Sequence, residues 1–275
     1  ERGQHPKEFY DLYEDCPFTE TPNVPHHKWG APYTREERRD RLRGYYAAVT
    51  AMDSDIGKLV SRLKEEGLWE DTIFLFTADN GMSMGHHGIF GKGNGTFPLN
   101  LYDTAVKVPM IITYPKGIRG GSVARGLYSH YDLLPTIAAL MGETPDSDCP
   151  GRSFAEIFRG QVPDGGTAVV VYDEYGPARM IRTEEYKYIR RYLGGEDEFY
   201  DLKADPGEEV NLAASEDPKV QERIAALGEA LEQWFARYSD PDRDGARQVV
   251  YGQGQIALVG EGGEGRKAFL GSQPS

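Results

Sequence analysis

An apolar run at residues 73–76 leads into Asp79, Asn80 and a Gly-rich loop, and this passage constrains the fold most strongly. A continuous apolar run of this length, bounded by turn residues, is typical of a strand that is buried on both faces. In open α/β folds, ligands collect at the carboxyl ends of such strands, where Asp79 and Asn80 fall. The glycines from Gly81 to Gly95 allow the loop backbone to approach a ligand closely. The passage therefore predicts a ligand site at the edge of a sheet.

The segments on either side of this strand favour an α/β architecture. Thr34 and Glu37 match a helix-initiating capping box, apolar residues then recur every three or four positions as far as Leu63, and Gly67 can end the helix. A second apolar strand is predicted at residues 108–113. Because helices alternate with apolar strands, we predict a mostly parallel sheet with flanking helices.

The sequence changes character after about residue 165. Short alternating runs between residues 169 and 201 predict strands of an antiparallel meander, and an amphipathic helix is expected at residues 217–238. We therefore predict an α/β domain at 1–165, a small antiparallel domain with a packed helix at 166–240, and a Gly-rich tail at 241–275.

The composition excludes some classes of function. A net charge of −13 over 275 residues opposes a nucleic-acid surface, which needs a basic stripe. We expect no membrane span, because no apolar run reaches the roughly 18 residues required. The chain starts at Glu1 without a signal-like segment, so a periplasmic or secreted location would require that a signal was lost upstream. Compartment and oligomeric state stay open.

Four residues of the loop are candidates for the chemistry. Asp79 and Asn80 offer adjacent hard oxygen donors, which suit Ca²⁺ or Mg²⁺ better than softer metals, although Asp-Asn-Gly on its own could also be a simple turn. Lys92 provides a compact positive charge suited to a tetrahedral oxyanion. One of His86 and His87 is expected to have a role in the site, and His87 is preferred.

Several motifs follow one another in a specific order. They are Thr77-Ala78-Asp79-Asn80-Gly81, Gly85-His86-His87-Gly88 and Gly91-Lys92-Gly93, together with residues 6–13, 45–53, 56–57, 108–109, 132–136, 180–189 and 198–206. In this order and spacing, the sequence resembles the sulfatases of the alkaline phosphatase superfamily over most of its length. The resemblance implies a partial alkaline-phosphatase-like sandwich followed by the small C-terminal sheet of that family.

The resemblance also implies roles for individual residues. Asp79 and Asn80 would be two of the Ca²⁺ ligands, with Mg²⁺ the less favoured metal, and Lys92 would contact a sulfate oxygen. His87 occupies the position of the family's Gly-x-His-Gly histidine. The family's formylglycine arises from a Cys/Ser-x-Pro/Ala-x-Arg motif, which neither Cys16-Pro17-Phe18 nor Cys149-Pro150-Gly151-Arg152 matches. We therefore expect that the chain corresponds to the C-terminal portion of a sulfatase, that the formylglycine lies in an N-terminal half outside it, and that the chain alone is inactive.

The function predicted from this resemblance is hydrolysis of a sulfate ester on a sugar, a small alcohol or a phenol, with this chain supplying part of the Ca²⁺ and sulfate site. One alternative is a phosphodiester or phosphonate monoester hydrolase of the same superfamily, but those enzymes more often place a histidine at the position of Asn80. A second alternative is a truncated, non-catalytic binding module. The expected partner is a sulfated small molecule or glycan.

Overall fold

The computed structural model describes residues 6–28, 30–96, 99–144, 148–161, 165–172, 178–192, 195–239 and 241. The chain divides into two compact units, Glu1–Gly121 and Ser122–Ser275. The predicted domain boundary near residue 165 stays a prediction. Nearly all of the predicted tail at 241–275 lies outside the described residues.

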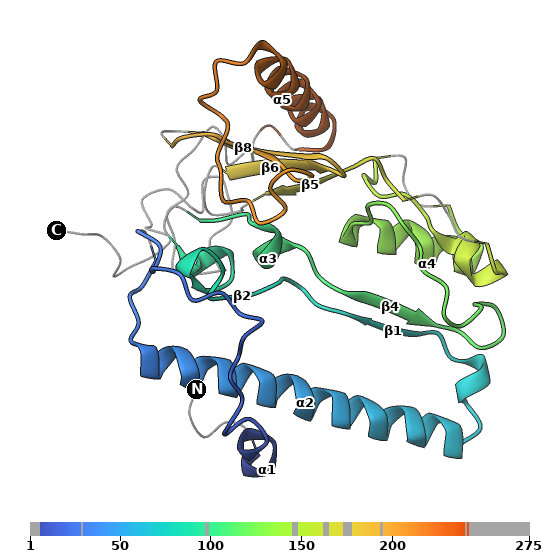
Figure 1. The fold of residues 1–275 in the computed structure, drawn as a ribbon. Helices are drawn as coiled ribbons and strands as arrows, with labels where there is room; N and C mark the ends of the chain where they lie inside the picture. The colour runs from blue at the N-terminus through green and yellow to red at the C-terminus, as the bar shows by residue number, and fades with distance from the viewer. Residues whose placement is uncertain are drawn as a thin grey trace. The chain divides into compact units, whose positions relative to one another are not determined.

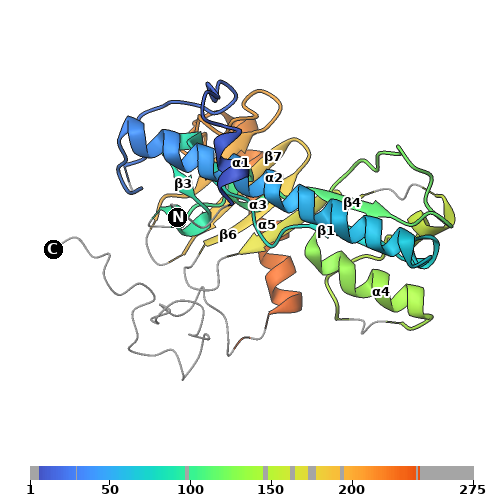
Figure 2. The same cartoon turned by 90° about the horizontal axis from the view of Figure 1, so that it is seen from below.

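The first unit is built on one long helix, α2 (Arg35–Glu65). Its predicted start is confirmed: the Thr34 hydroxyl accepts from the Glu37 amide at 3.1 Å, and the Glu37 carboxylate accepts from the Thr34 amide at 2.7 Å. Its predicted end is confirmed as well, because Gly67 follows the helix with a left-handed φ of 71°. The short helix α1 (Lys7–Asp11) packs against α2, which extends along strands β1 and β4 and lies in front of them when seen from below (Figures 1 and 2).

Strands β1 (Phe74–Thr77) and β4 (Met110–Thr113) pair with each other in a two-stranded sheet. The pairing is antiparallel, with Thr77 opposite Met110, so the predicted parallel arrangement is wrong for these strands. The reason is the connection. The described residues between 78 and 109 form only short elements, and β4 starts beside the end of β1, whereas parallel pairing needs a crossover to the other end.

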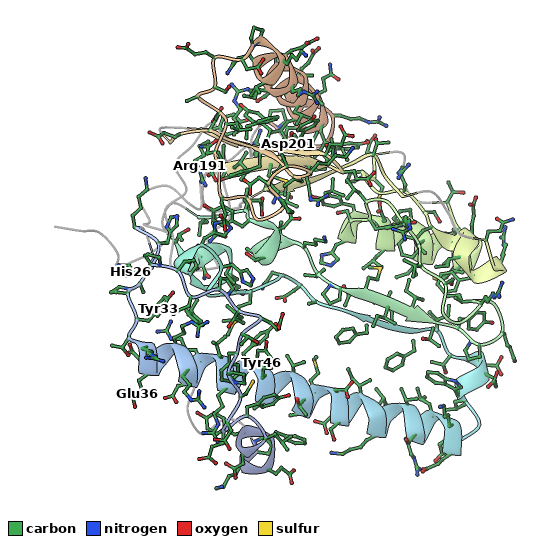
Figure 3. All side chains as sticks on the ribbon, viewed as in Figure 1. His26, Tyr33, Glu36, Tyr46, Arg191 and Asp201 are labelled. Carbon is green, nitrogen blue, oxygen red and sulfur yellow. The ribbon has the colours of Figure 1, made fainter. Side chains whose placement is uncertain are left out.

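The connection between β1 and β4 holds the Gly-rich loop. Its elements are β2 (Ser83–Met84), η2 (His86–Gly88), β3 (Phe90–Gly91), η3 (Gly93–Gly95) and α3 (Asp103–Val106), and η1 (Trp69–Asp71) precedes β1. Met84 of β2 belongs to a buried cluster with Phe18 and Leu42. Tyr46 of α2, labelled in Figure 3, packs edge-on against Phe18 at 5.3 Å between ring centroids. This cluster attaches the loop to α2.

The second unit contains the predicted antiparallel meander. The strands β5 (Ala168–Tyr172), β6 (Ala178–Thr183), β7 (Tyr186–Arg191) and β8 (Glu198–Asp201) pair in sequence order, and all pairs are antiparallel. Helix α5 (Pro218–Tyr238) begins at Asp217, whose carboxylate accepts from the Lys219 amide, and it covers one face of this sheet (Figure 1). The other elements are η4 (His130–Asp132), α4 (Leu133–Met141) and η5 (Ala155–Arg159). The α/β class with a small C-terminal antiparallel sheet and a packed helix is thus confirmed.

No helix in the described part of the chain is long and apolar enough to cross a membrane.

The Lys187–Glu208 ion pair is the most deeply buried charged contact among the described residues. The side chains are 0% and 2% exposed. Removing one partner of such a pair leaves the other charge buried without compensation. We expect Lys187→Met to lower the free energy of unfolding by about 3–5 kcal/mol, measured by chemical denaturation.

The matched control is Lys203→Met, which removes the exposed Lys203–Glu185 pair. Because water screens an exposed pair, this variant should unfold at nearly the same denaturant concentration as the parent chain. Equal losses in the two variants would contradict a special contribution from the buried pair.

Candidate active-site loop

Asp79 and Asn80 lie just beyond the end of β1, and local hydrogen bonds orient both side chains. The Asp79 Oδ1 accepts from the Asn80 amide at 2.8 Å, and the Asn80 Nδ2 donates to the Gly81 carbonyl at 2.8 Å. Because the Asn80 Nδ2 faces the Gly81 carbonyl, the Oδ1 of the same amide group points in the opposite direction. This Oδ1 accepts from the Lys92 Nζ at 3.3 Å. The structure therefore brings Asn80 and Lys92 together across the loop.

The turn at Gly81 is held by direct backbone contact with α3. The Gly81 amide donates to the Ala105 carbonyl at 2.9 Å, and a Cβ at Gly81 would lie only 2.3 Å from the Thr104 carbonyl oxygen. The hydroxyls of Ser83 and Thr104 also share a hydrogen bond of 2.7 Å. Only glycine fits at position 81, so the sequence of this turn fixes how closely α3 approaches the site.

The end of β1 offers two oxygen donors of the kind that a hard cation binds, which is fewer than a full ligand set. Asp79 is exposed, and it provides a carboxylate beside the amide oxygen of Asn80. Within the described residues, no group of three or more His, Cys, Asp or Glu side chains could hold a metal ion. Because Ca²⁺ takes six to eight oxygen ligands, Asp79 and Asn80 fit as two members of a larger set.

The two histidines of the loop have different surroundings. Burial lowers the pKa of His86 below its usual value, because desolvation disfavours the charged imidazolium. Its Nδ1 is buried and has no hydrogen-bond partner within the described residues. The ring of His87 stacks on Tyr102, with 3.7 Å between centroids and 8° between planes. His87 also adopts a left-handed φ of 53°, which is uncommon for a residue other than glycine.

A Pro-rich segment before α2 packs directly on the loop that bears the histidines. The His27 amide donates to the Gly88 carbonyl at 3.1 Å, and Gly30 forms a β-bridge with Thr96. A Cβ at Gly88 would lie 1.9 Å from the Pro25 carbonyl oxygen. Figure 3 labels His26 and Tyr33 in this part of the chain. The backbone at Pro25, His27 and Gly30 therefore packs directly against the loop.

Two contributions to the site were missed by the sequence analysis. Tyr102 orients the His87 ring, and the segment around Pro25 fixes the loop backbone. No periodic or motif signal identifies either contribution, because both depend on contacts between segments that are separate in sequence. The glycine at position 88 is the one sequence feature that could have indicated a close backbone approach.

Gly88→Ala tests the contact with residues 25–27. Its Cβ would overlap the Pro25 carbonyl, and alanine is strained at the φ of 69° found here. We expect the variant to lose about 1–3 kcal/mol in free energy of unfolding and to expose the His27 amide to hydrogen exchange. Gly120→Ala is the control, because a Cβ there meets no atom within 4 Å. Unchanged protection of the His27 amide in Gly88→Ala would show that the contact does not hold the loop.

Family models match two overlapping parts of the chain. The model "Sulfatase" matches residues 2–143, and the model "N-sulphoglucosamine sulphohydrolase, C-terminal" matches residues 85–237.

Individual relatives agree with these matches. An N-acetylglucosamine-6-O-sulfatase of Bacteroides thetaiotaomicron is 32% identical over 222 residues, which cover 76% of this chain and 38% of the relative. A choline-sulfatase of Rhizobium meliloti is 30% identical, covering 75% of this chain and 43% of the relative. The chain spans about two fifths of the length of these curated relatives.

Solved structures give the same result. A structure in complex with its substrate D-glucosamine-2-N,6-O-disulfate superposes with a TM-score of 0.66 at 31% identity, covering 76% of this chain and 43% of the other. A 2-O GAG sulfatase superposes with a TM-score of 0.62 at 27% identity, covering 76% and 45%. The predicted alkaline-phosphatase-like fold is therefore confirmed. Both family models match, and the N-acetylglucosamine-6-O-sulfatase is 32% identical to the chain. The chain therefore belongs to the sulfatases, an enzyme family of the alkaline phosphatase superfamily.

Proposed function

We propose that the protein hydrolyses sulfate esters of a sugar, and that this chain supplies part of a Ca²⁺ and sulfate site. The named relatives support the reaction class, since one acts on N-acetylglucosamine 6-O-sulfate and a solved neighbour holds a disulfated glucosamine. In this proposal Asp79 and Asn80 are metal ligands, Lys92 contacts the sulfate, and His87 lies beside it.

The observation that carries the proposal is the 3.3 Å contact between the Lys92 Nζ and the Asn80 Oδ1. This contact holds an ammonium group next to one of the oxygens assigned to the metal. A sulfate oxygen bound at this point would face positive charge from the ammonium as well as from the cation. Charge that develops on the sulfate oxygens during cleavage is then stabilised by a preorganised partner, and this kind of electrostatic term often dominates catalysis.

A bound Ca²⁺ would supply Lewis-acid polarisation of a sulfate oxygen. The residues of this chain would perform the remaining positioning. Lys92 binds the anionic group, and the stack on Tyr102 holds the His87 ring in one orientation. The family implies a formylglycine nucleophile, but the sequences after Cys16 and Cys149 do not fit its motif, so we assign the nucleophilic step to no residue of this chain.

Hydrolysis of phosphodiesters or phosphonate monoesters is the competing reaction. The resemblance implies that the phosphoryl hydrolases more often place a histidine at position 80, whereas Asn80 offers an amide oxygen to a hard cation. We favour sulfate because of this difference. A binding module without activity would keep the same loop but would release no product from either kind of ester.

The metal assignment predicts stabilisation of the chain by calcium. Because a ligand that binds only the folded state stabilises it, Ca²⁺ at about five times its Kd should add about 1 kcal/mol to the free energy of unfolding. The measurement is the thermal melting temperature at increasing millimolar CaCl₂, with MgCl₂ for comparison.

Asp79→Ala should abolish the shift with calcium. Asp55→Ala is the matched control, because Asp55 is an exposed carboxylate on α2 that lies far from the loop in sequence. A melting temperature of the parent chain that does not respond to calcium would contradict the assignment, as would a shift that survives in Asp79→Ala.

The role of Lys92 is tested on the full-length protein with an aryl sulfate and an aryl phosphodiester. We expect faster turnover of the sulfate, and a fall in its kcat by about 10²–10³-fold in Lys92→Ala, because one stabilising cation is lost. Lys58→Ala, an exposed lysine of α2, should leave kcat unchanged. Preference for the phosphodiester would favour the competing reaction, and turnover of neither ester would favour the binding module.

A further inference from the structure

Asn100 is a buried polar residue at the back of the candidate loop. The residue is only 4% exposed. Its Nδ2 donates to the carbonyls of Lys92 and Gly93 at 3.2 Å and 3.0 Å, and it lies 3.3 Å from the Thr96 hydroxyl oxygen. Its backbone amide also donates to the Gly93 carbonyl at 3.0 Å. One residue thus contacts the loop at Lys92, Gly93 and Thr96.

The chemistry of these partners fixes the orientation of the amide. Two of the three oxygens are carbonyls, which can only accept, so the NH₂ group must face them. The opposite atom, the Asn100 Oδ1, is buried and has no hydrogen-bond partner within the described residues. Leaving a buried acceptor unpaired costs about 1–3 kcal/mol. The use of an asparagine at this position therefore lies in the hydrogen bonds that its Nδ2 donates to the loop.

The Lys92 carbonyl receives two hydrogen bonds, one from the Asn100 side chain and one from the Gly95 amide at 2.8 Å. Lys92 is therefore held at its own backbone while its Nζ reaches the Asn80 Oδ1. A lysine side chain has four rotatable bonds and loses substantial entropy when it is ordered, so a fixed starting point limits the positions that the ammonium can sample.

We propose that Asn100 is a positioning residue for Lys92, and that it holds the lysine backbone so that the ammonium faces the sulfate site. The inference rests on the proposed role of Lys92. Asn100 itself does not touch substrate; it acts through the Lys92 carbonyl.

The test uses kcat for aryl sulfate hydrolysis by the full-length protein, normalised to the folded fraction from near-UV circular dichroism. We expect Asn100→Ser to lower kcat by about 10–100-fold, because a small misplacement of a catalytic group has an effect of this size. In a Lys92→Ala background the same substitution should change kcat by less than about twofold, because residues that act as a unit are non-additive.

Two matched variants separate positioning from stability. Thr96→Val removes one acceptor of the same Asn100 amide but keeps its bond to Lys92, so kcat should stay within about threefold of the parent. Asn211→Ser removes an asparagine from the C-terminal sheet unit, where its Oδ1 accepts from the Phe199 amide at 3.0 Å. It should lower the melting temperature without a change in kcat per folded molecule.

The outcomes distinguish the inference from the proposed function. If Lys92→Ala leaves kcat unchanged, the assigned role of Lys92 is wrong and the role of Asn100 is wrong with it. If Lys92→Ala is impaired and Asn100→Ser lowers kcat equally in both backgrounds, Lys92 keeps its role and the positioning inference alone is overturned. If Asn100→Ser in the parent changes kcat by less than about threefold, the inference is overturned as well.

Discussion

Close backbone contact is the constraint on which the candidate site depends. At Gly81 and at Gly88, a carbonyl oxygen of another segment occupies the space where a side chain would begin. Such contact leaves no flexible atoms to absorb a shift, so a displacement of the Thr104 or Pro25 backbone would move the loop with it. The positions of Asn80, His87 and Lys92 are thereby tied to segments that precede and follow them in the sequence.

The same part of the chain contains a strained backbone position and buried polar atoms without partners. His87 has a left-handed φ, the His86 Nδ1 is buried without a partner among the described residues, and the Asn100 Oδ1 is in the same situation. Each of these features is unfavourable for folding on its own, and each persists only because the surrounding contacts over-determine the backbone. These three residues precede and follow Lys92 in the sequence, between positions 86 and 100.

The parts of the fold that the sequence predicts are those with local causes. The start of α2 follows from Thr34 and Glu37, which contact each other directly, and the meander follows from short alternating runs joined by tight turns. The direction of β4 against β1 could not be predicted. An apolar run indicates that both faces of a strand are buried, but it does not indicate whether the neighbouring strand is parallel or antiparallel.

The site shows the same division. Residue types and spacing single out Asp79, Asn80, His87 and Lys92, and of these the structure brings Asn80 and Lys92 into contact. The Asn100 and Tyr102 contacts could not be predicted, because the role of an asparagine or a tyrosine side chain depends on which residues pack against it in the folded chain. The path of residues 97–98, which join the loop to Asn100, lies outside the described residues.

The site that we propose for this loop is organised by contacts within the chain itself. Strands β1 and β4 form only a two-stranded sheet, with Leu75 exposed on one face and Ile111 on the other, and a pair of strands is marginal without further packing. The loop beyond β1 does not rely on that sheet alone, since the segment at Pro25 and His27, helix α3 and Asn100 all contact it from within the first unit. The distance between Asn80 and Lys92 is therefore set by contacts within the first unit. Cleavage of an ester would also need a nucleophile, which no motif of this sequence provides.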